Sequence, residues 1–166
     1  EEDGKKSMKT PILETSRLWL KPLKEEDAPD AFLWTGDPKV SWYMRYETHE
    51  SLEDTKQWLR EEEKQLDSDL LYDFGFHKKD NDELIGSGGL TFNQQQGIWE
   101  LGCNLRRDCW NQGYGTEAAA AILSFAGNTL HIHRVMARHA KDNTASGRVL
   151  EKNGFSFVRE CWDQKW

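Results

Sequence analysis

The sequence predicts a single α+β (mixed α/β) domain built around one sheet. Three neighbouring segments show the alternation of apolar and polar residues that is typical of strands, and short polar turns separate them. These segments are residues 71–78, 83–92 and 97–105. Strands joined by such short turns run antiparallel. Predicted helices precede and follow this meander in the sequence. No linker rich in Pro, Gly or Ser divides the 166 residues, so one domain is expected.

The flanking segments complete the predicted order of elements. Residues 17–23 (RLWLKPL) alternate and favour a strand. Residues 24–35 begin with acids and continue with apolar residues, which favours a helix. Residues 51–68 begin at Ser51 and have the charged outer face of a long amphipathic helix. After the meander we expect a helix over 116–130, a strand over 133–140, a helix over 144–154 and a strand over 155–160.

Composition and charge narrow the possible partners. The chain is 37% hydrophobic and 31% charged, which is typical of a folded globular protein. A formal net charge of −7 argues against a nucleic-acid partner, because nucleic-acid-binding surfaces are normally basic. It is compatible with a cationic partner such as an amine. No apolar run approaches the roughly 20 residues of a membrane span, so no membrane partner is expected.

The cysteines and the ends of the chain lead to further expectations. Cys103, Cys109 and Cys161 have no metal-type spacing and form no even disulfide set, which predicts free thiols, no metal site and a cytoplasmic location. We interpret residues 1–10 as an N-terminal tail, with Met8 as a candidate natural start after added residues, and residues 11–166 as the domain.

A glycine-rich turn, WNQGYGTEAAAA at residues 110–121, is the most informative stretch for function. Gly113 and Gly115 allow backbone N–H groups to approach a ligand closely. The alanines that follow favour a helix that begins at once. A glycine-rich turn that leads into a helix N-terminus is suited to binding phosphate.

Three interpretations compete for this turn. A P-loop requires a lysine before the final Ser or Thr, and Gly115-Thr116 lacks it. A dinucleotide-binding fingerprint tolerates Ala118 at its third glycine position, but it requires a parallel strand–turn–helix–strand unit, and the preceding strands form an antiparallel meander. The third interpretation is a strand-to-helix turn that binds no ligand.

The wider segment 106–118 resembles motif A of the GNAT superfamily of acetyl-CoA-dependent N-acyltransferases. That motif has Gln or Arg, two further residues, Gly, one residue, and then Gly or Ala. Gly113 and Gly115 match it, whereas Trp110 stands where Gln or Arg is usual. An aromatic residue there is similar to the RimJ/RimL branch, the ribosomal-protein N-terminal acetyltransferases and their relatives. Asn111 departs from the glycine that is commoner in the branch.

The resemblance covers nearly the whole chain. Residues 14–32, 99–110 and 130–160 are similar to further segments of the RimJ/RimL branch in the same order. It implies a GNAT-like twisted, mostly antiparallel sheet with helices on both faces, in which strands 97–105 and 133–140 splay apart to hold acetyl-CoA. Acetyl-CoA is thus the expected co-substrate, with no metal.

The resemblance also implies a set of coenzyme-binding residues. The backbone of the turn would hold the pyrophosphate, and the backbone near the end of strand 97–105 would bind the pantetheine arm. Arg107 could add positive charge, or it could be an exposed structural arginine. Asn143 would bind the arm, or it could simply cap a helix. Glu117 is expected to face away from the polyanion. The expected set is Cys103, Leu105, Arg107, Gln112, Gly113, Tyr114, Gly115, Thr116, Asn143 and Ser146.

Catalytic and acceptor residues follow from the same resemblance. Glu100 would remove a proton from the attacking amine, unless it is a strand glutamate paired with an arginine. Ser146 would protonate or hydrogen-bond the leaving thiolate, unless it is a first-turn helix serine. No residue matches the tyrosine acid of other GNAT enzymes. Trp34, Trp42, Tyr43 and Tyr46 fall where GNAT folds close the acceptor pocket, although core packing is the alternative for each.

We therefore expect an N-acetyltransferase that moves acetyl from acetyl-CoA to a primary amine by direct attack in a ternary complex. A protein N-terminal α-amine is the first candidate acceptor. The alternatives are a small amine, polyamine or antibiotic acceptor, or a non-catalytic acyl-CoA-binding module. The branch normally continues into a final strand beyond Trp166, so that strand is expected to lie outside this sequence, to be missing, or to come from a partner chain. A homodimer is left open.

Overall fold

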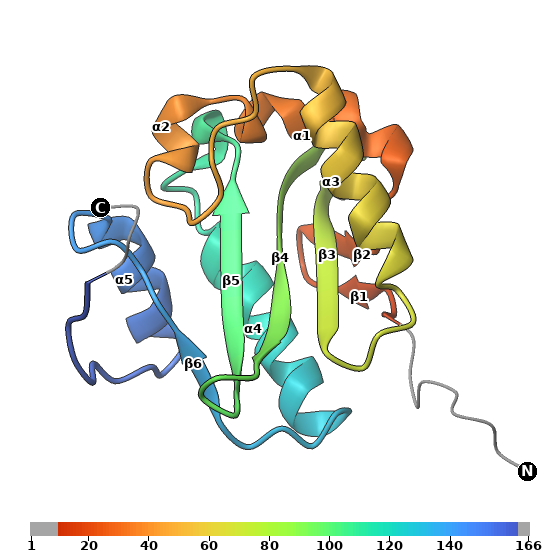
Figure 1. Ribbon diagram of the computed structural model, residues 1–166. Helices are drawn as coiled ribbons and strands as arrows, with labels where there is room; N and C mark the ends of the chain where they lie inside the picture. The colour runs from red at the N-terminus through yellow and green to blue at the C-terminus, as the bar shows by residue number, and fades with distance from the viewer. Residues whose placement is uncertain (1–9, 163–166) are drawn as a thin grey trace, which may run out of the picture.

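The computed structural model describes residues 10–162, which form one six-stranded sheet with helices on both faces (Figure 1). Five strands are antiparallel in chain order, and the sixth runs parallel to the fifth at the edge. The strands are β1 (Leu13–Glu14), β2 (Leu18–Lys21), β3 (Leu71–Lys78), β4 (Leu84–Asn93), β5 (Ile98–Leu105) and β6 (Val135–Ala137). The predicted fold class is confirmed.

Four of the five helices lie close to the predicted segments, and α2 was not predicted. They are α1 (Ala28–Thr35), α2 (Pro38–Ser41), α3 (Leu52–Lys64), α4 (Tyr114–Asn128) and α5 (Thr144–Lys152), with short 3-10 turns η1 (Glu25–Asp27) and η2 (Arg107–Cys109). The Ser51 side chain caps α3 by accepting the backbone N–H of Asp54, and the Asp54 carboxylate accepts the backbone N–H of Ser51. Within residues 10–162, no helix is both long and apolar enough to cross a membrane.

Two of the predicted strands differ from the structure. The strand expected at 133–140 shortens to the three residues of β6. The strand expected at 155–160 does not form, and Phe157 and Val158 remain 80% and 85% exposed. That prediction was wrong because alternation describes which side chains suit a strand, whereas a strand also requires a neighbour to accept its backbone hydrogen bonds.

Two apolar clusters lie on opposite faces of the sheet. The larger lies between the sheet and α4, where Tyr72, Phe74 and Phe76 of β3 meet Ile122 and Phe125. The smaller lies under α1 and α3 and contains Trp34, Leu59 and Leu84. The alternation along β3 therefore directs its aromatic residues toward α4 and leaves Asp73 toward α3.

A pair of carboxyl groups joins α3 to β3. Glu62 and Asp73 hydrogen-bond to each other, and the indole N–H of Trp58 donates to Glu62 Oε1 at 3.1 Å. Burial raises the pKa of both groups, and the charge of Asp73 raises the pKa of Glu62 further. The contact is therefore favourable only while the two carboxyls share a proton.

We predict that Glu62→Gln stabilises the protein at pH 8 and leaves it nearly unchanged at pH 5. Folding raises the pKa of Glu62. The contribution of this group to stability is therefore complete below its ordinary pKa of 4.5, and it is lost progressively as pH rises toward and through the pKa in the folded protein. Glutamine donates a hydrogen bond without binding a proton. We expect a gain of about 1–2 kcal/mol, or roughly 2–8 °C in Tm by circular dichroism.

Glu61→Gln is the matched control, because Glu61 lies on the same helix with its side chain 51% exposed. Its Tm should change little at either pH. Equal shifts at pH 5 and pH 8 for Glu62→Gln would show that the two carboxyls share no proton.

Candidate functional site

The turn before α4 has a backbone that few residues can adopt. Gly113 is the N-cap of α4 and has φ of 83°, in the left-handed region that favours glycine. Asn111 is also left-handed, with φ of 59°. Asparagine tolerates this conformation better than other non-glycine residues, which explains why it can replace the commoner glycine there.

The turn presents a run of backbone donors. No described residue accepts a hydrogen bond from the N–H groups of Gln112, Gly113, Tyr114, Gly115 or Thr116. They stand at the positive end of the dipole of α4, a helix of 15 residues. Five donors at one helix N-terminus suit a pyrophosphate group, so this part of the site fits coenzyme A.

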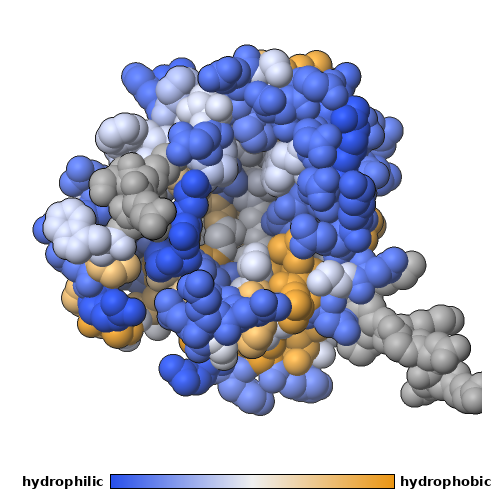
Figure 2. Space-filling model, viewed as in Figure 1, coloured by the Kyte–Doolittle hydropathy of each residue, from blue (hydrophilic) through white to orange (hydrophobic). Residues whose placement is uncertain are grey.

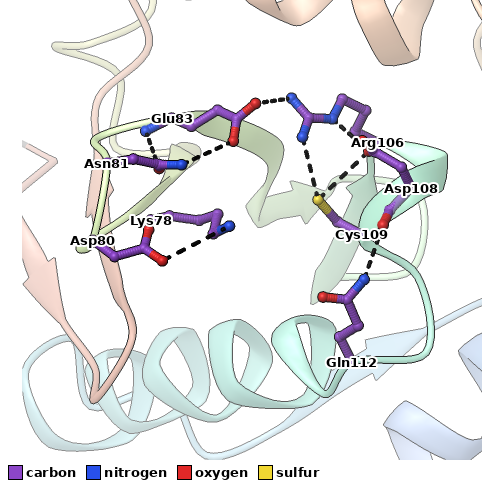
Figure 3. Close-up of polar contacts among 8 residues, drawn as sticks. All are labelled: Lys78, Asp80, Asn81, Glu83, Arg106, Asp108, Cys109 and Gln112. Atoms are coloured by element: carbon purple, nitrogen blue, oxygen red, sulfur yellow. Dashed lines mark hydrogen bonds and ion pairs between the residues drawn. The ribbon is translucent and has the colours of Figure 1, made fainter.

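Arg106 fixes the segment that leads into the turn (Figure 3). Its side chain is 14% exposed and reaches Glu83 at 2.6 Å and Asp108 at 2.5 Å. The pairing with Glu83 and Asp108 raises the pKa of Arg106 above its usual range. Gln112 Nε2 then donates to the carbonyl of Asp108 at 2.9 Å. The turn is thereby attached to the start of β4.

A second arginine holds the turn from the side of β1 and β2. Arg17 donates through Nε to Glu117 at 2.8 Å and through Nη1 to the carbonyl of Gln112 at 3.0 Å. Thr15 also donates to Glu117. Burial alone would raise the pKa of Glu117, but the bonds from Thr15 and Arg17 outweigh burial and lower it. The Glu117 carboxylate thus faces Thr15 and Arg17.

Strands β5 and β6 diverge beside this turn. They pair only over Trp99–Val135, Glu100–Met136 and Leu101–Ala137, whereas β5 continues to Leu105. The edge of β5 beyond Leu101 is therefore left open by β6. A Cβ on Gly102 would meet no atom within 4 Å, and Figure 2 shows the same face hollowed over β5.

The end of β5 explains the tryptophan that departs from the superfamily motif. The indole N–H of Trp110 donates to the carbonyl of Leu105 at 2.9 Å.

The half-buried Cys103 packs against the larger apolar cluster. Burial raises the pKa of the Cys103 thiol to about 12, with a smaller contribution from Asp73. Cys103 is therefore a neutral thiol at pH 7 and a poor nucleophile.

Glu100 lies on β5 and pairs with an arginine. Its two carboxylate oxygens accept from Nε and Nη2 of Arg138, each at 2.9 Å. The Glu100 side chain is 20% exposed, on the same face of the sheet as Asn104. Glu100 is thus a strand glutamate paired with an arginine, which is the alternative to a catalytic base. Its carboxylate remains accessible where β5 and β6 diverge.

Asn143 and Ser146 lie together at the start of α5. Asn143 Oδ1 accepts the backbone N–H of Ser146 at 3.2 Å, so Asn143 caps the helix. Its amide N–H groups and the half-buried Ser146 hydroxyl have no partner among residues 10–162. Both side chains therefore keep donors for a ligand.

Two expected site residues make structural contacts. Arg107 pairs with Asp37, the N-cap of α2, at 3.1 Å, which is the structural role named above as its alternative. Trp34 is 0% exposed inside the smaller apolar cluster, so it cannot contact an acceptor. Trp42, 61% exposed, and Tyr43, half-buried, follow α2 and remain acceptor candidates. An aromatic pattern alone does not distinguish a core position from a pocket wall.

Tyr46, another candidate for the acceptor pocket, attaches this loop to β5 through Asn104 and Ser87, two residues that sequence reasoning missed. The Tyr46 hydroxyl donates to Asn104 Oδ1 at 3.1 Å, and Asn104 Nδ2 donates to the carbonyl and hydroxyl of Ser87. Burial raises the pKa of Tyr46 above its usual range. Tyr46 also contacts His49, with ring centroids 5.8 Å apart. Arg17 was likewise missed, because its partners are about 100 residues away in sequence.

No group of His, Cys, Asp and Glu in the described part of the chain could hold a metal ion. The cysteines within it, Cys103, Cys109 and Cys161, are free thiols, as predicted.

Comparison with known proteins identifies clear relatives. A family model described as the acetyltransferase (GNAT) domain matches residues 17–156. The uncharacterized N-acetyltransferase YoaA of Bacillus subtilis (strain 168) is 30% identical over 146 residues, covering 87% of this chain and 82% of that protein. A ribosomal protein uS5 alanine N-acetyltransferase of Escherichia coli (strain K12) is 32% identical over 85 residues, covering 49% and 43%. A GNAT-family acetyltransferase crystal structure from Bacillus anthracis has a TM-score of 0.76 at 24% identity, covering 87% and 82%.

Proposed function

Because the chain belongs to the GNAT family of acetyltransferases, we propose that it transfers acetyl from acetyl-CoA to a protein N-terminal α-amine. The observation that carries the donor assignment is the run of five N–H groups from Gln112 to Thr116 that have no acceptor among residues 10–162. They fit the pyrophosphate of coenzyme A, and the open edge of β5 near Cys103 and Leu105 fits its pantetheine arm. Acetyl-CoA supplies the acetyl group as a thioester.

The chain's own residues provide the remaining roles. Asn143 can bind the pantetheine arm through its free amide donors, and Ser146 can donate to the leaving sulfur. Glu100 can accept the proton that the amine loses, directly or through water, while Arg138 holds the carboxylate in place. The neutral thiol of Cys103 argues against an acyl-enzyme on that residue, which favours direct attack by the amine.

Two arguments support an α-amine acceptor. The E. coli relative carries the name of an N-acetyltransferase that acts on alanine of a ribosomal protein. An α-amine also has an unperturbed pKa of about 7.7–8.0, against about 10.4 for lysine, so it is already partly neutral at pH 7 and requires less from a base. The net charge of −7 favours cationic acceptors in general, so small amines and polyamines are the competing class.

An amine panel tests the acceptor. We predict that free coenzyme A thiol is released fastest with an unblocked peptide that lacks lysine. The same peptide with a blocked N-terminus and one lysine should react at least about tenfold more slowly, because its amine is almost fully protonated at pH 7. Faster turnover of spermidine or an aminoglycoside would instead identify a small-molecule acetyltransferase.

A pair of variants tests the base. We predict that Glu100→Gln lowers kcat by roughly 10²-fold, with acetyl-CoA affinity nearly unchanged. Raising the pH should partly restore the rate, because solvent then deprotonates the amine. Arg138→Gln breaks the same ion pair but keeps the carboxylate. Similar pH–rate profiles for the two variants would show that Glu100 has only a structural role.

The two glycines of the turn provide a matched pair for coenzyme binding. We predict that Gly113→Ala weakens acetyl-CoA binding about tenfold by calorimetry, because alanine disfavours a φ of 83° and distorts the donors. Gly115→Ala should change affinity less than about twofold. Its Cβ would lie in ordinary contact, 3.6 Å from Val149 and 3.7 Å from Leu105. Equal affinities for both variants would contradict pyrophosphate binding at this turn.

A further inference from the structure

We propose that Arg17 is a further coenzyme-binding residue, whose Nη2 donates to the pyrophosphate held by the turn before α4. This inference rests on the acetyl-CoA site proposed above. It adds a side chain from the segment between β1 and β2 to a site that otherwise consists of backbone donors.

The guanidinium of Arg17 is fixed on three sides. Nε donates to Glu117, Nη1 donates to the carbonyl of Gln112, and the guanidinium carbon lies 4.2 Å from the centroid of the Tyr114 ring. These contacts set the plane of the group before any ligand arrives. A rigid, planar donor loses little conformational freedom when it binds an oxyanion.

The third nitrogen has no acceptor of its own. No described residue accepts a hydrogen bond from Arg17 Nη2. It lies 3.2 Å from the point that a Cβ on Gly113 would occupy. Nη2 therefore lies beside Gly113 at the start of α4, and the Arg17 side chain remains 43% exposed to an incoming ligand.

The other arginines beside the turn are engaged with carboxylates. Arg106 pairs with Glu83 and Asp108, and Arg107 pairs with Asp37. Trp110 occupies the motif position where Gln or Arg is usual, and its indole N–H is bound to Leu105. Arg17 is the arginine whose guanidinium lies against Gly113, with Nη2 3.2 Å from the point that a Cβ there would occupy.

The charge arrangement also favours this role. Glu117 lies in the first turn of α4, where its carboxylate would repel a polyanion. Arg17 neutralises that carboxylate and still presents an N–H toward the turn. A charge-assisted hydrogen bond from a guanidinium to phosphate is stronger than one from a neutral donor.

The test must separate direct contact from support of the turn. Arg17→Gln and Glu117→Gln both break the ion pair between Arg17 and Glu117, but only the first removes the proposed donor. Calorimetry with acetyl-CoA at low and high salt is the measurement, and melting temperatures without ligand report folding. Direct contact predicts about tenfold weaker binding for Arg17→Gln, with the loss reduced at high salt. It predicts unchanged or tighter binding for Glu117→Gln.

The other results overturn the proposal. Equal weakening in both variants would show that Arg17 acts only by holding the turn. Unchanged affinity in Arg17→Gln, while the wild-type protein binds acetyl-CoA, would exclude Arg17 and leave the proposed function intact. A wild-type protein that does not bind acetyl-CoA would refute the proposed function together with this inference.

Discussion

The proposed site depends on a run of five backbone N–H groups that find no acceptor among residues 10–162. A helix N-terminus always has such groups, but a free turn could rearrange and direct them elsewhere. Here Gly113 adopts a left-handed conformation, Arg106 attaches the preceding segment to the start of β4, and Arg17 holds the carbonyl of Gln112. These contacts anchor the turn before any anion binds, which would reduce the ordering cost of binding.

The two faces of the sheet support different parts of the proposed site. The face toward α4 is apolar, and it positions the helix whose N-terminus is the proposed anion site. The other face is more polar, with Asn104 bound to Ser87 and Tyr46. That contact joins the loop carrying Trp42 to β5, the strand expected to hold the donor. This contact therefore holds the loop with the proposed acceptor residues beside β5.

Much of the fold could be predicted because periodicity is a local property. The meander of β3, β4 and β5, the long α3 and the turn before α4 lie close to their expected positions. The site was predicted less completely. The turn and Glu100 remain candidates, whereas Trp34 is a core residue that cannot contact an acceptor. Arg107 pairs with Asp37, the structural role left open for it. The surroundings of both side chains come from distant parts of the chain, which local patterns do not reveal.

The sequence by itself determined the alternation of the strands, the capping signal at Ser51 and the glycine that permits the turn, because each depends on neighbouring residues. The tertiary structure decided which charges pair and which strand ends stay open. Arg17 meets Glu117 across 100 residues, and β6 stops at Ala137 while β5 continues. Ion pairs and strand pairing depend on distance in space, and folding, rather than sequence separation, sets that distance.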